Sequence, residues 1–112
     1  MSTNYYYRWR DKRGRVGKLH IGKCSAGWTF LFRAYPAQEL KSFAQWLHFM
    51  AINEGTIYDE YDRKVDFVHF CKVVYDHKKK KKHKEEAFKE KIEDYSFFED
   101  EAGYEFSIDE FC

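Results

Sequence analysis

The sequence predicts an α+β fold, a small antiparallel sheet with two main helices packed on one face. Three observations favour this fold class. Aromatic residues make up 21% of the 112 residues, enough to build a core although 35% are charged. Residues alternate with the period of a β-strand in the first third of the chain, and apolar residues recur at helical spacing in its middle. A chain of this length supports one core, so residues 1–112 are expected to form a single domain.

Three strands are expected at the start of the chain. The segment NYYYRWR is rich in strand-forming residues, and the DKRG within the next stretch is typical of a turn. Leu19 and Ile21 alternate with polar residues, and beyond a turn around Gly27 the apolar residues Trp28 and Phe30 resume the alternation. These patterns predict a meander over residues 4–10, 17–23 and 28–35.

The segment GKLHIGKC, residues 17–24, matches the opening of a phosphate-binding P-loop. That motif needs Ser or Thr after the lysine and a helix directly behind it. Cys24 stands in the Ser/Thr position, and the residues on both sides alternate as in strands. We therefore interpret the match as part of a β-hairpin. A weaker alternative stays open, in which the turn from Gly22 to Trp28 binds an anion with the help of Lys23 and Ser25.

The first helix is predicted over residues 37–52. Pro36 is tolerated as a first helical residue, and Gly55 supplies a left-handed cap at the other end. The expected apolar stripe consists of Leu40, Phe43, Leu47 and Met50. We expect this stripe to lie on the aromatic face of the sheet.

The second helix is predicted over residues 66–77, with Asp66 as its N-cap. Its apolar stripe consists of Phe67, Phe70, Cys71 and Val74. No Gly or Pro interrupts the charged residues 78–91, so the helix can extend through this lysine-rich segment. Repulsion between adjacent lysines favours a protruding loop instead.

Shorter elements complete the fold. The segment TIYDEYDRKV between the helices is typical of a short ribbon around an Asp-rich turn. A C-terminal hairpin is expected around Ala102 and Gly103. Ser107 and Glu110 have the spacing of a capping box, which predicts a last helical turn.

The net charge of +1 hides a strong segregation of charge along the chain. Counting Lys and Arg against Asp and Glu gives +7 for residues 1–35, −3 for 36–77, +5 for 78–91 and −8 for 92–112, which add up to +1. Two interpretations stay open: the segments neutralise one another, or they form separate charged surfaces for partners.

Several classes of protein are not expected. Cys24, Cys71 and Cys112 lie far apart without Cys or His partners at ligand spacing, so neither a disulfide framework nor a metal site is expected. No cofactor motif and no catalytic constellation of His, Cys and acids is recognised, so an enzyme is not expected. The chain shows no signal peptide and no apolar run of membrane-spanning length, so we expect a soluble cytoplasmic protein without a membrane partner.

Binding to nucleic acid is one function that the composition favours. The stretch YYYRWRDKRGR interleaves rings, which can stack on bases, with arginines, which can contact phosphates. The lysine run would attract any polyanion. The simpler alternative is that the rings are core and the cations are solvated. The candidate binding residues are Arg8, Arg10, Arg13, Arg15, His20, Lys23, Ser25, Trp28, Arg33, Lys78, Lys79, Lys80, Lys81 and Lys82.

Three stretches, LHIGKCSAGWTFLFRAYP, TIYDEYDRKVDFVHF and EDEAGYEFSIDEF, resemble a family of small uncharacterised proteins encoded by tailed bacteriophages. Members of that family often carry a Cys-x-x-Cys pair before the first stretch. Here RWRDKRGR, residues 8–15, stands in that place, so the resemblance implies no metal site for this chain.

The resemblance implies a small phage accessory protein that acts in the cytoplasm of the infected host cell. Proteins of this kind commonly bind and inhibit a host protein or protein complex, for example a defence complex in an anti-CRISPR or other anti-defence role. Two alternatives stay open: a nucleic-acid-binding protein that uses the basic, aromatic N-terminus and the lysine-rich segment, and a protein that binds a small phosphorylated signalling nucleotide.

Overall fold

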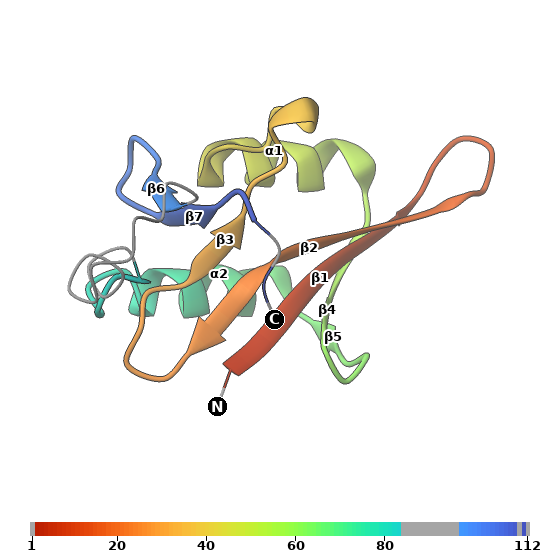
Figure 1. The fold of residues 1–112 in the computed structure, drawn as a ribbon. Helices are drawn as coiled ribbons and strands as arrows, with labels where there is room; N and C mark the ends of the chain where they lie inside the picture. Colours follow the sequence, from red (N-terminus) through yellow and green to blue (C-terminus); the bar gives the residue numbers. More distant parts are fainter. Residues whose placement is uncertain (1, 84–96, 110, 112) are drawn as a thin grey trace.

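A computed structural model describes residues 2–83, 97–109 and 111 (Figure 1). Seven strands form one sheet in the order β5-β4-β1-β2-β3-β7-β6. Neighbouring strands are antiparallel except β3 and β7, which run parallel. The strands are β1 (Ser2–Arg10), β2 (Val16–Ser25), β3 (Leu31–Arg33), β4 (Thr56–Asp59), β5 (Lys64–Val65), β6 (Phe97–Glu99) and β7 (Glu105–Ser107).

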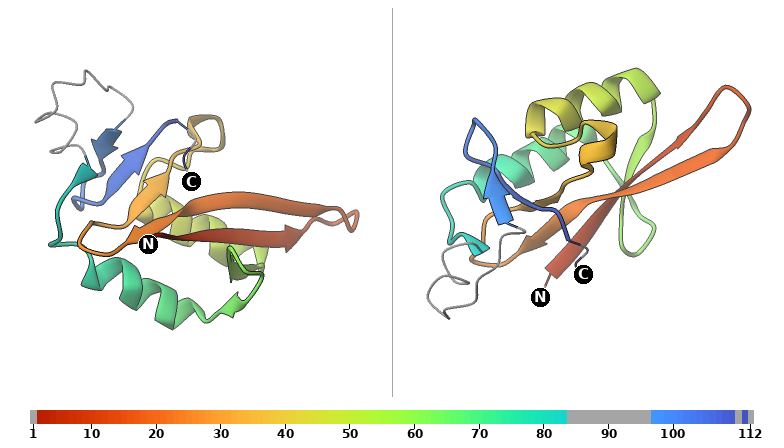
Figure 2. Two further views of the ribbon diagram at one scale, coloured as in Figure 1. Left: turned by 60° about the horizontal axis from the view of Figure 1, so that its bottom comes forward. Right: turned by 45° about the horizontal axis from the view of Figure 1, so that its top comes forward.

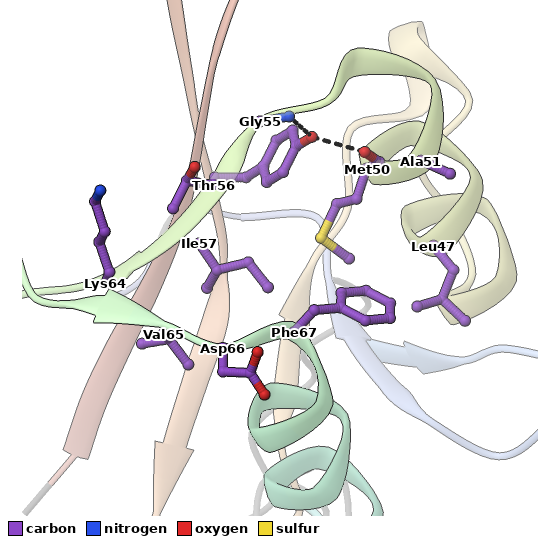
Figure 3. A pocket seen from close by; sticks show the side chains of 11 residues that line it. Leu47, Met50, Ala51, Gly55, Thr56, Ile57, Lys64, Val65, Asp66 and Phe67 are labelled. Carbon is purple, nitrogen blue, oxygen red and sulfur yellow. Dashed lines mark hydrogen bonds between the residues drawn. The ribbon is translucent and has the colours of Figure 1, made fainter.

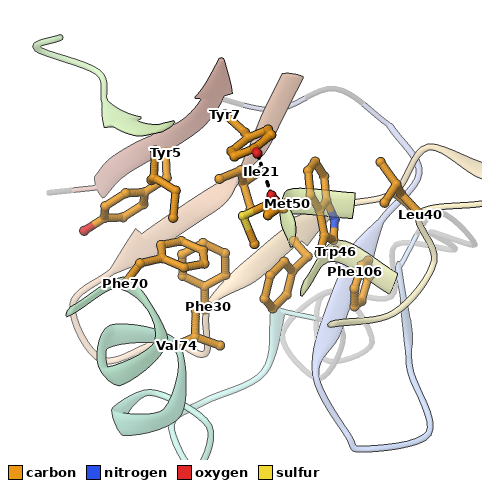
Figure 4. Packing of buried hydrophobic residues seen from close by; sticks show 13 residues of the cluster. Tyr5, Tyr7, Ile21, Phe30, Leu40, Trp46, Met50, Phe70, Val74 and Phe106 are labelled. Carbon is orange, nitrogen blue, oxygen red and sulfur yellow. Dashed lines mark hydrogen bonds between the residues drawn. The ribbon is translucent and has the colours of Figure 1, made fainter. Parts of the chain in front are cut away.

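The helices α1 (Phe43–Asn53) and α2 (Phe67–Asp76) pack on one face of this sheet (Figure 2). Side chains alternate across a strand, and the core takes the inward-facing rings of the strands together with buried residues of both helices (Figure 4). The strands contribute Tyr5, Tyr7, Ile21, Phe32, Ile57 and Phe106, the segment before β3 contributes Phe30, and the helices contribute Trp46, Met50, Phe70 and Val74. The predicted α+β fold class is therefore confirmed.

Tyr7 ties β1 to the end of α1. Its hydroxyl donates to the carbonyl of Met50 over 2.8 Å and accepts from the backbone N–H of Gly55. The last carbonyls of a helix have no partner inside the helix, so this contact satisfies one of them in a buried place. Burial raises the pKa of the Tyr7 hydroxyl, although the hydrogen bond from Gly55 opposes the shift.

The start of the first helix was predicted too early. Pro36–Gln38 form a separate 3₁₀ turn, and Tyr35 and Leu40 then exchange backbone hydrogen bonds of 2.9 and 3.1 Å around Glu39, whose φ of 58° is left-handed. Because these bonds close the loop, α1 begins only after Ser42, whose hydroxyl accepts from the N–H of Gln45.

The predicted glycine cap of α1 is also wrong. Glu54, with a φ of 51°, is the left-handed residue that ends the helix. Gly55 is needed for another reason, because a Cβ there would lie 2.2 Å from the carbonyl oxygen of Arg8 on β1.

The second helix does not extend through the lysine run. Asp66 is its N-cap, as predicted, but α2 ends at Asp76. The chain then turns, and Lys81 exchanges backbone hydrogen bonds with the segment before β3: it donates to the carbonyl of Gly27 and accepts from the N–H of Thr29. These bonds remove Trp28 from the predicted third strand and also from the core cluster. Residues 84–91 of the charged segment lie outside the described residues.

The short elements follow the prediction closely. The ribbon between the helices is formed by β4 and β5, and β6 and β7 form the C-terminal hairpin around Ala102 and Gly103. No last helical turn is found within the described residues, because Ser107 belongs to β7 and donates its hydroxyl to the carbonyl of Asp109. Glu110, its expected capping partner, lies outside the described residues.

Candidate nucleic-acid interface

The hairpin of β1 and β2 extends well beyond the body of the protein (Figures 1 and 2). We call residues 8–18 of this hairpin the basic arm. Arg8 stands opposite Lys18 and Arg10 opposite Val16 in the strand register. The arm carries six basic residues and one acid, Asp11, which gives a net charge of +5.

Asp11 closes the turn at the tip of the arm. Its carboxylate accepts the backbone N–H groups of Arg13 and Arg15, each over 2.9 Å, and its carbonyl accepts from Gly14, whose φ of 78° suits glycine. A carboxylate that satisfies two backbone donors of the turn serves local structure. The side chains of Lys12, Arg13 and Arg15 remain exposed at the tip.

The arginines nearer the body are held by neighbours. Arg8 forms an ion pair with Asp62, and its guanidinium carbon lies 4.3 Å from the ring centre of Tyr58. Arg10 donates to the carbonyl of Gly14 over 3.1 Å. These contacts orient the two guanidinium groups, which lowers the entropy they lose when they bind an anion.

Trp9 anchors the base of the arm to the body. Its ring packs edge-on against Phe49 of α1, with ring centres 5.1 Å apart, and stacks on Tyr7. Gly17 faces it across the strands, and a Cβ there would lie 2.4 Å from the indole. Of the rings in YYYRWR, Tyr5, Tyr7 and Trp9 therefore pack with the core, and Tyr6 lies on the other face.

The turn between β2 and β3 does not form a P-loop. β2 continues through Lys23 and Cys24 to Ser25, so no helix begins behind the lysine, and the interpretation as a hairpin is confirmed. The ammonium of Lys23 lies 5.3 Å from the ring of Phe111, and the hydroxyl of Ser25 bonds that of Ser2 over 2.6 Å.

The remaining candidates lie along this hairpin, with His20 on β2, Arg33 on β3 and Trp28 in the segment before β3. His20 hydrogen-bonds the side-chain oxygen of Asn4 over 2.9 Å and stacks on Tyr6. The guanidinium of Arg33 lies 4.9 Å from the ring of Tyr35. Trp28 stacks on His83, with ring centres 4.7 Å apart.

The buried carboxylate of Glu105 joins the segment before β3 to the end of the lysine run. Glu105 is 1% exposed and accepts the hydroxyl of Thr29 over 3.0 Å and the backbone N–H of His83 over 2.8 Å. Burial lowers the pKa of His83, although the charge of Glu105 opposes the shift. No sequence pattern indicated this contact, because 76 residues separate Thr29 from Glu105.

The lysine run lies at the end of the molecule opposite the tip of the arm (Figure 1). The ammonium of Lys78 lies 4.7 Å from the ring of Tyr104, that of Lys81 lies 5.1 Å from Trp28, and Lys82 pairs with Glu99 over 2.5 Å. Lys79 and Lys80 are exposed. The structure therefore brings Trp28 to the lysine run but leaves both far from the arginines of the arm.

A groove of about 700 Å³ lies between the two helices, on the face of the sheet that carries them (Figure 3). Leu47 and Met50 of α1 face Phe67 of α2 across it, and Ile57 of β4 lines the side formed by the sheet. Most of the lining is apolar, with Thr56, Lys64 and Asp66 as its polar side chains. Two apolar residues that follow lining residues in the sequence, Ile52 after Ala51 and Val68 after Phe67, are 64% and 72% exposed.

Two kinds of feature are absent from the described part of the chain. Within residues 2–83, 97–109 and 111, His, Cys and acidic side chains form no group of three that could hold a metal ion. Over the same residues, no helix has both the length and the apolar character needed to cross a bilayer.

Comparison with known proteins finds no protein-family model, no curated protein and no solved structure that matches this chain. The resemblance to phage proteins therefore stays a prediction. The features that bear on function are the basic arm, the face of the sheet that carries no helix, and the groove between the helices.

Proposed function

We propose that this protein binds nucleic acid through the basic arm. The observation that carries the proposal is a projecting β-ribbon with a net charge of +5, whose only acid, Asp11, bonds the backbone of its own turn and lies 4.0 Å from Nε of Arg15. A two-stranded ribbon fits the major groove of a duplex and can also follow a single strand, with its cations on the phosphates. The cations at the tip are exposed, so they can reach phosphates without any change in the fold.

A comparison of two double variants tests the proposal. Arg13→Gln with Arg15→Gln removes two cations from the tip of the arm, and Lys41→Gln with Lys72→Gln removes two exposed cations from the helix side. Affinity for a labelled oligonucleotide is measured by fluorescence anisotropy over a series of salt concentrations. We expect the arm variant to bind more weakly, and we expect its slope of log K against log salt to fall by about 1 for each phosphate that the arm no longer neutralises.

The control variant has the same net charge as the arm variant, so it separates binding at the arm from the general attraction of a cationic protein. We expect it to bind like the wild type. Equal weakening in both variants, or a wild type that binds no oligonucleotide at low salt, would contradict the proposal.

We also propose a second function, binding to a host protein, which the groove between the helices supports. A partner that presents the apolar side of an amphipathic helix would cover Phe67, Val68 and Ile52, which the fold leaves 48 to 72% exposed. For a phage accessory protein, which the resemblance implies, such a contact would block a host factor.

A pull-down after nuclease treatment tests this second function. We expect a protein partner that is retained by the wild type and by Val16→Asp on the arm, and is absent with Val68→Asp, since both valines are exposed to a similar degree. If Val68→Asp still retains the protein partner, the contact lies elsewhere, and the groove no longer supports this second function.

A further inference from the structure

A row of rings crosses three strands on the outer face of the sheet. Tyr58 of β4, Tyr6 of β1 and His20 of β2 stand directly opposite one another in the strand register. Their neighbours along the strands, such as Tyr7 and Ile57, point into the core, so these three point away from it. Both helices lie on the other face (Figure 2). We call Tyr58, Tyr6 and His20 the ring row.

The ring row adjoins the first cations of the basic arm. Arg8 and Lys18 stand opposite each other in the strand register, close to this row. The guanidinium of Arg8 lies 4.3 Å from the ring centre of Tyr58, and the ammonium of Lys18 lies 4.5 Å from that of Tyr6. Rings and cations therefore lie side by side where the sheet continues into the arm.

Two further side chains contact this surface. Asp62 pairs with Arg8, and Phe111 packs on His20 with ring centres 4.9 Å apart. A base can therefore stack on Tyr6 and Tyr58 more readily than on His20.

Such a surface can take a base and its phosphate together. An exposed ammonium over a ring is held weakly, whereas a base stacked on a tyrosine is held more strongly. A base can therefore replace Lys18 above Tyr6, and the released ammonium can then contact the neighbouring phosphate. The bases of a duplex are stacked on one another and do not offer their faces in this way.

We propose that the ring row is a stacking platform for unpaired bases, and that single-stranded nucleic acid is therefore the ligand of this surface. The proposal rests on the proposed binding of nucleic acid by the arm and names its substrate class. Bases stack on Tyr6 and Tyr58, and the phosphates follow Arg8 and Lys18 onto the arm, with a phosphate taking the place of the Asp62 carboxylate on Arg8.

The test compares single-stranded and duplex oligonucleotides of equal length with the wild type and with Tyr6→Leu and Tyr58→Leu. Tyr75→Leu is the matched control, since Tyr75 is an exposed tyrosine of α2 on the helix side. We expect the wild type to prefer the single strand. Each ring-row variant should bind it about tenfold more weakly, with an unchanged salt slope because the phosphate-binding cations are all kept. Tyr75→Leu should bind as the wild type does.

A second measurement does not depend on the folding of the variants. Photocrosslinking of the wild type to a bromouracil-containing single strand, followed by mass spectrometry, should place crosslinks on Tyr6 or Tyr58. Crosslinks confined to other residues would overturn the platform.

The outcomes separate the two proposals. Equal affinity for single strand and duplex, with unchanged binding in the ring-row variants but weaker binding in the arm variant, would overturn the platform and leave binding by the arm intact. Binding of neither oligonucleotide at low salt would overturn both.

Discussion

Gly22 lets two strands approach each other closely in the middle of the sheet. Its φ lies outside the left-handed region, so its backbone is one that any residue adopts. A Cβ at this position would lie 2.2 Å from the carbonyl oxygen of Leu31 and 2.6 Å from the ring of Phe30. The close approach of Leu31 and Phe30, and not the backbone conformation, therefore requires glycine at position 22. Gly22 is also the second glycine of the P-loop-like spacing.

We expect Gly22→Ala to lower the free energy of unfolding by about 3 kcal/mol or more, because a backbone oxygen cannot move aside as a flexible side chain can. Gly27→Ala is the matched control. Gly27 has a φ of 80° and open space around its Cβ position, so only the left-handed conformation is penalised, by about 1–2 kcal/mol. Urea unfolding measures both changes. Equal destabilisation would show that β2 and β3 do not approach closely at Gly22.

Asp59 holds the turn between β4 and β5 together. Its carboxylate accepts the backbone N–H groups of Tyr61 and Arg63 and pairs with the guanidinium of Arg63 over 2.7 Å. Burial alone would raise the pKa of this carboxyl, but the hydrogen bonds from Arg63 and Tyr61 and the charge of Arg63 outweigh it, and the pKa is lowered.

A lowered pKa makes stability depend on pH in a defined direction. The contribution of Asp59 is present above the ordinary carboxyl pKa of 3.8 and is lost as the pH falls through the lower pKa of the folded state. We expect Asp59→Asn to unfold more easily at neutral pH and to show a flatter decline of stability in acid. Asp62→Asn, whose side chain is 73% exposed, should follow the wild type in urea unfolding over a pH series. Parallel profiles for wild type and Asp59→Asn would contradict the role of the carboxylate.

The helix α2 has one buried side and one exposed side. Phe70 is fully buried against the rings of Tyr5 and Phe30, with ring centres 5.5 Å apart in both pairs, whereas Val68 is 72% exposed. We expect Phe70→Ala to lower the free energy of unfolding by about 3–5 kcal/mol. Val68→Ala should change it by less than about 0.5 kcal/mol. Denaturant unfolding measures both changes. A larger loss of stability in Val68→Ala than in Phe70→Ala would mean that α2 is rotated about its axis.

The elements that the sequence predicted are those specified by local patterns. Strand-forming residues located β1, period-two alternation located β2, and Asp66 marked the start of α2. The errors arise where distant backbone groups compete with local preference. Lys81 has good helix propensity, yet its backbone bonds to Gly27 and Thr29. No local pattern encodes the parallel pairing of β3 with β7, because the two strands are far apart in sequence.

The candidate site was predictable to a similar extent. Charge alone located the arginines of the arm, because their density is visible in the sequence. The ring row was not predicted as a unit, since Tyr58 joins Tyr6 and His20 only through the register of β4, β1 and β2. Alternation within a strand indicates on which face of the sheet a residue lies. Only the order and register of the strands show which residues of other strands lie beside it.

Among the described residues, many acidic side chains form hydrogen bonds that hold the fold, while many basic side chains project into solvent. Acidic side chains close the turns at Asp11, Asp59 and Asp100, cap α2 at Asp66, and pair with Lys82 at Glu99. Asp100 also accepts the backbone N–H of Phe43 at the start of α1. The ion pairs of Lys82 with Glu99 and of Arg8 with Asp62 favour partial internal neutralisation at the lysine run and at the base of the arm, and the exposed cations at the tip keep the arm positively charged.

One core cluster joins the sheet to both helices, so we expect the molecule to unfold in a single cooperative transition. Trp46 is buried in this core, whereas Trp28 packs on His83 near the lysine run. Within each single-tryptophan variant, one that keeps Trp46 and one that keeps Trp28, far-UV circular dichroism and tryptophan fluorescence should give the same urea midpoint. A fluorescence midpoint below the circular-dichroism midpoint in the variant that keeps Trp28 would show that this region unfolds separately from the core.

The parallel pairing of β3 with β7 has a consequence for synthesis on the ribosome. Residues 31–33 emerge early, but the strand that covers their free edge, residues 105–107, emerges much later in translation. Until then the nascent polypeptide offers an open strand edge, next to Phe30 and Phe32, to other chains. Products that stop before residue 105 should therefore aggregate or recruit chaperones, whereas products that reach residue 107 can close the sheet.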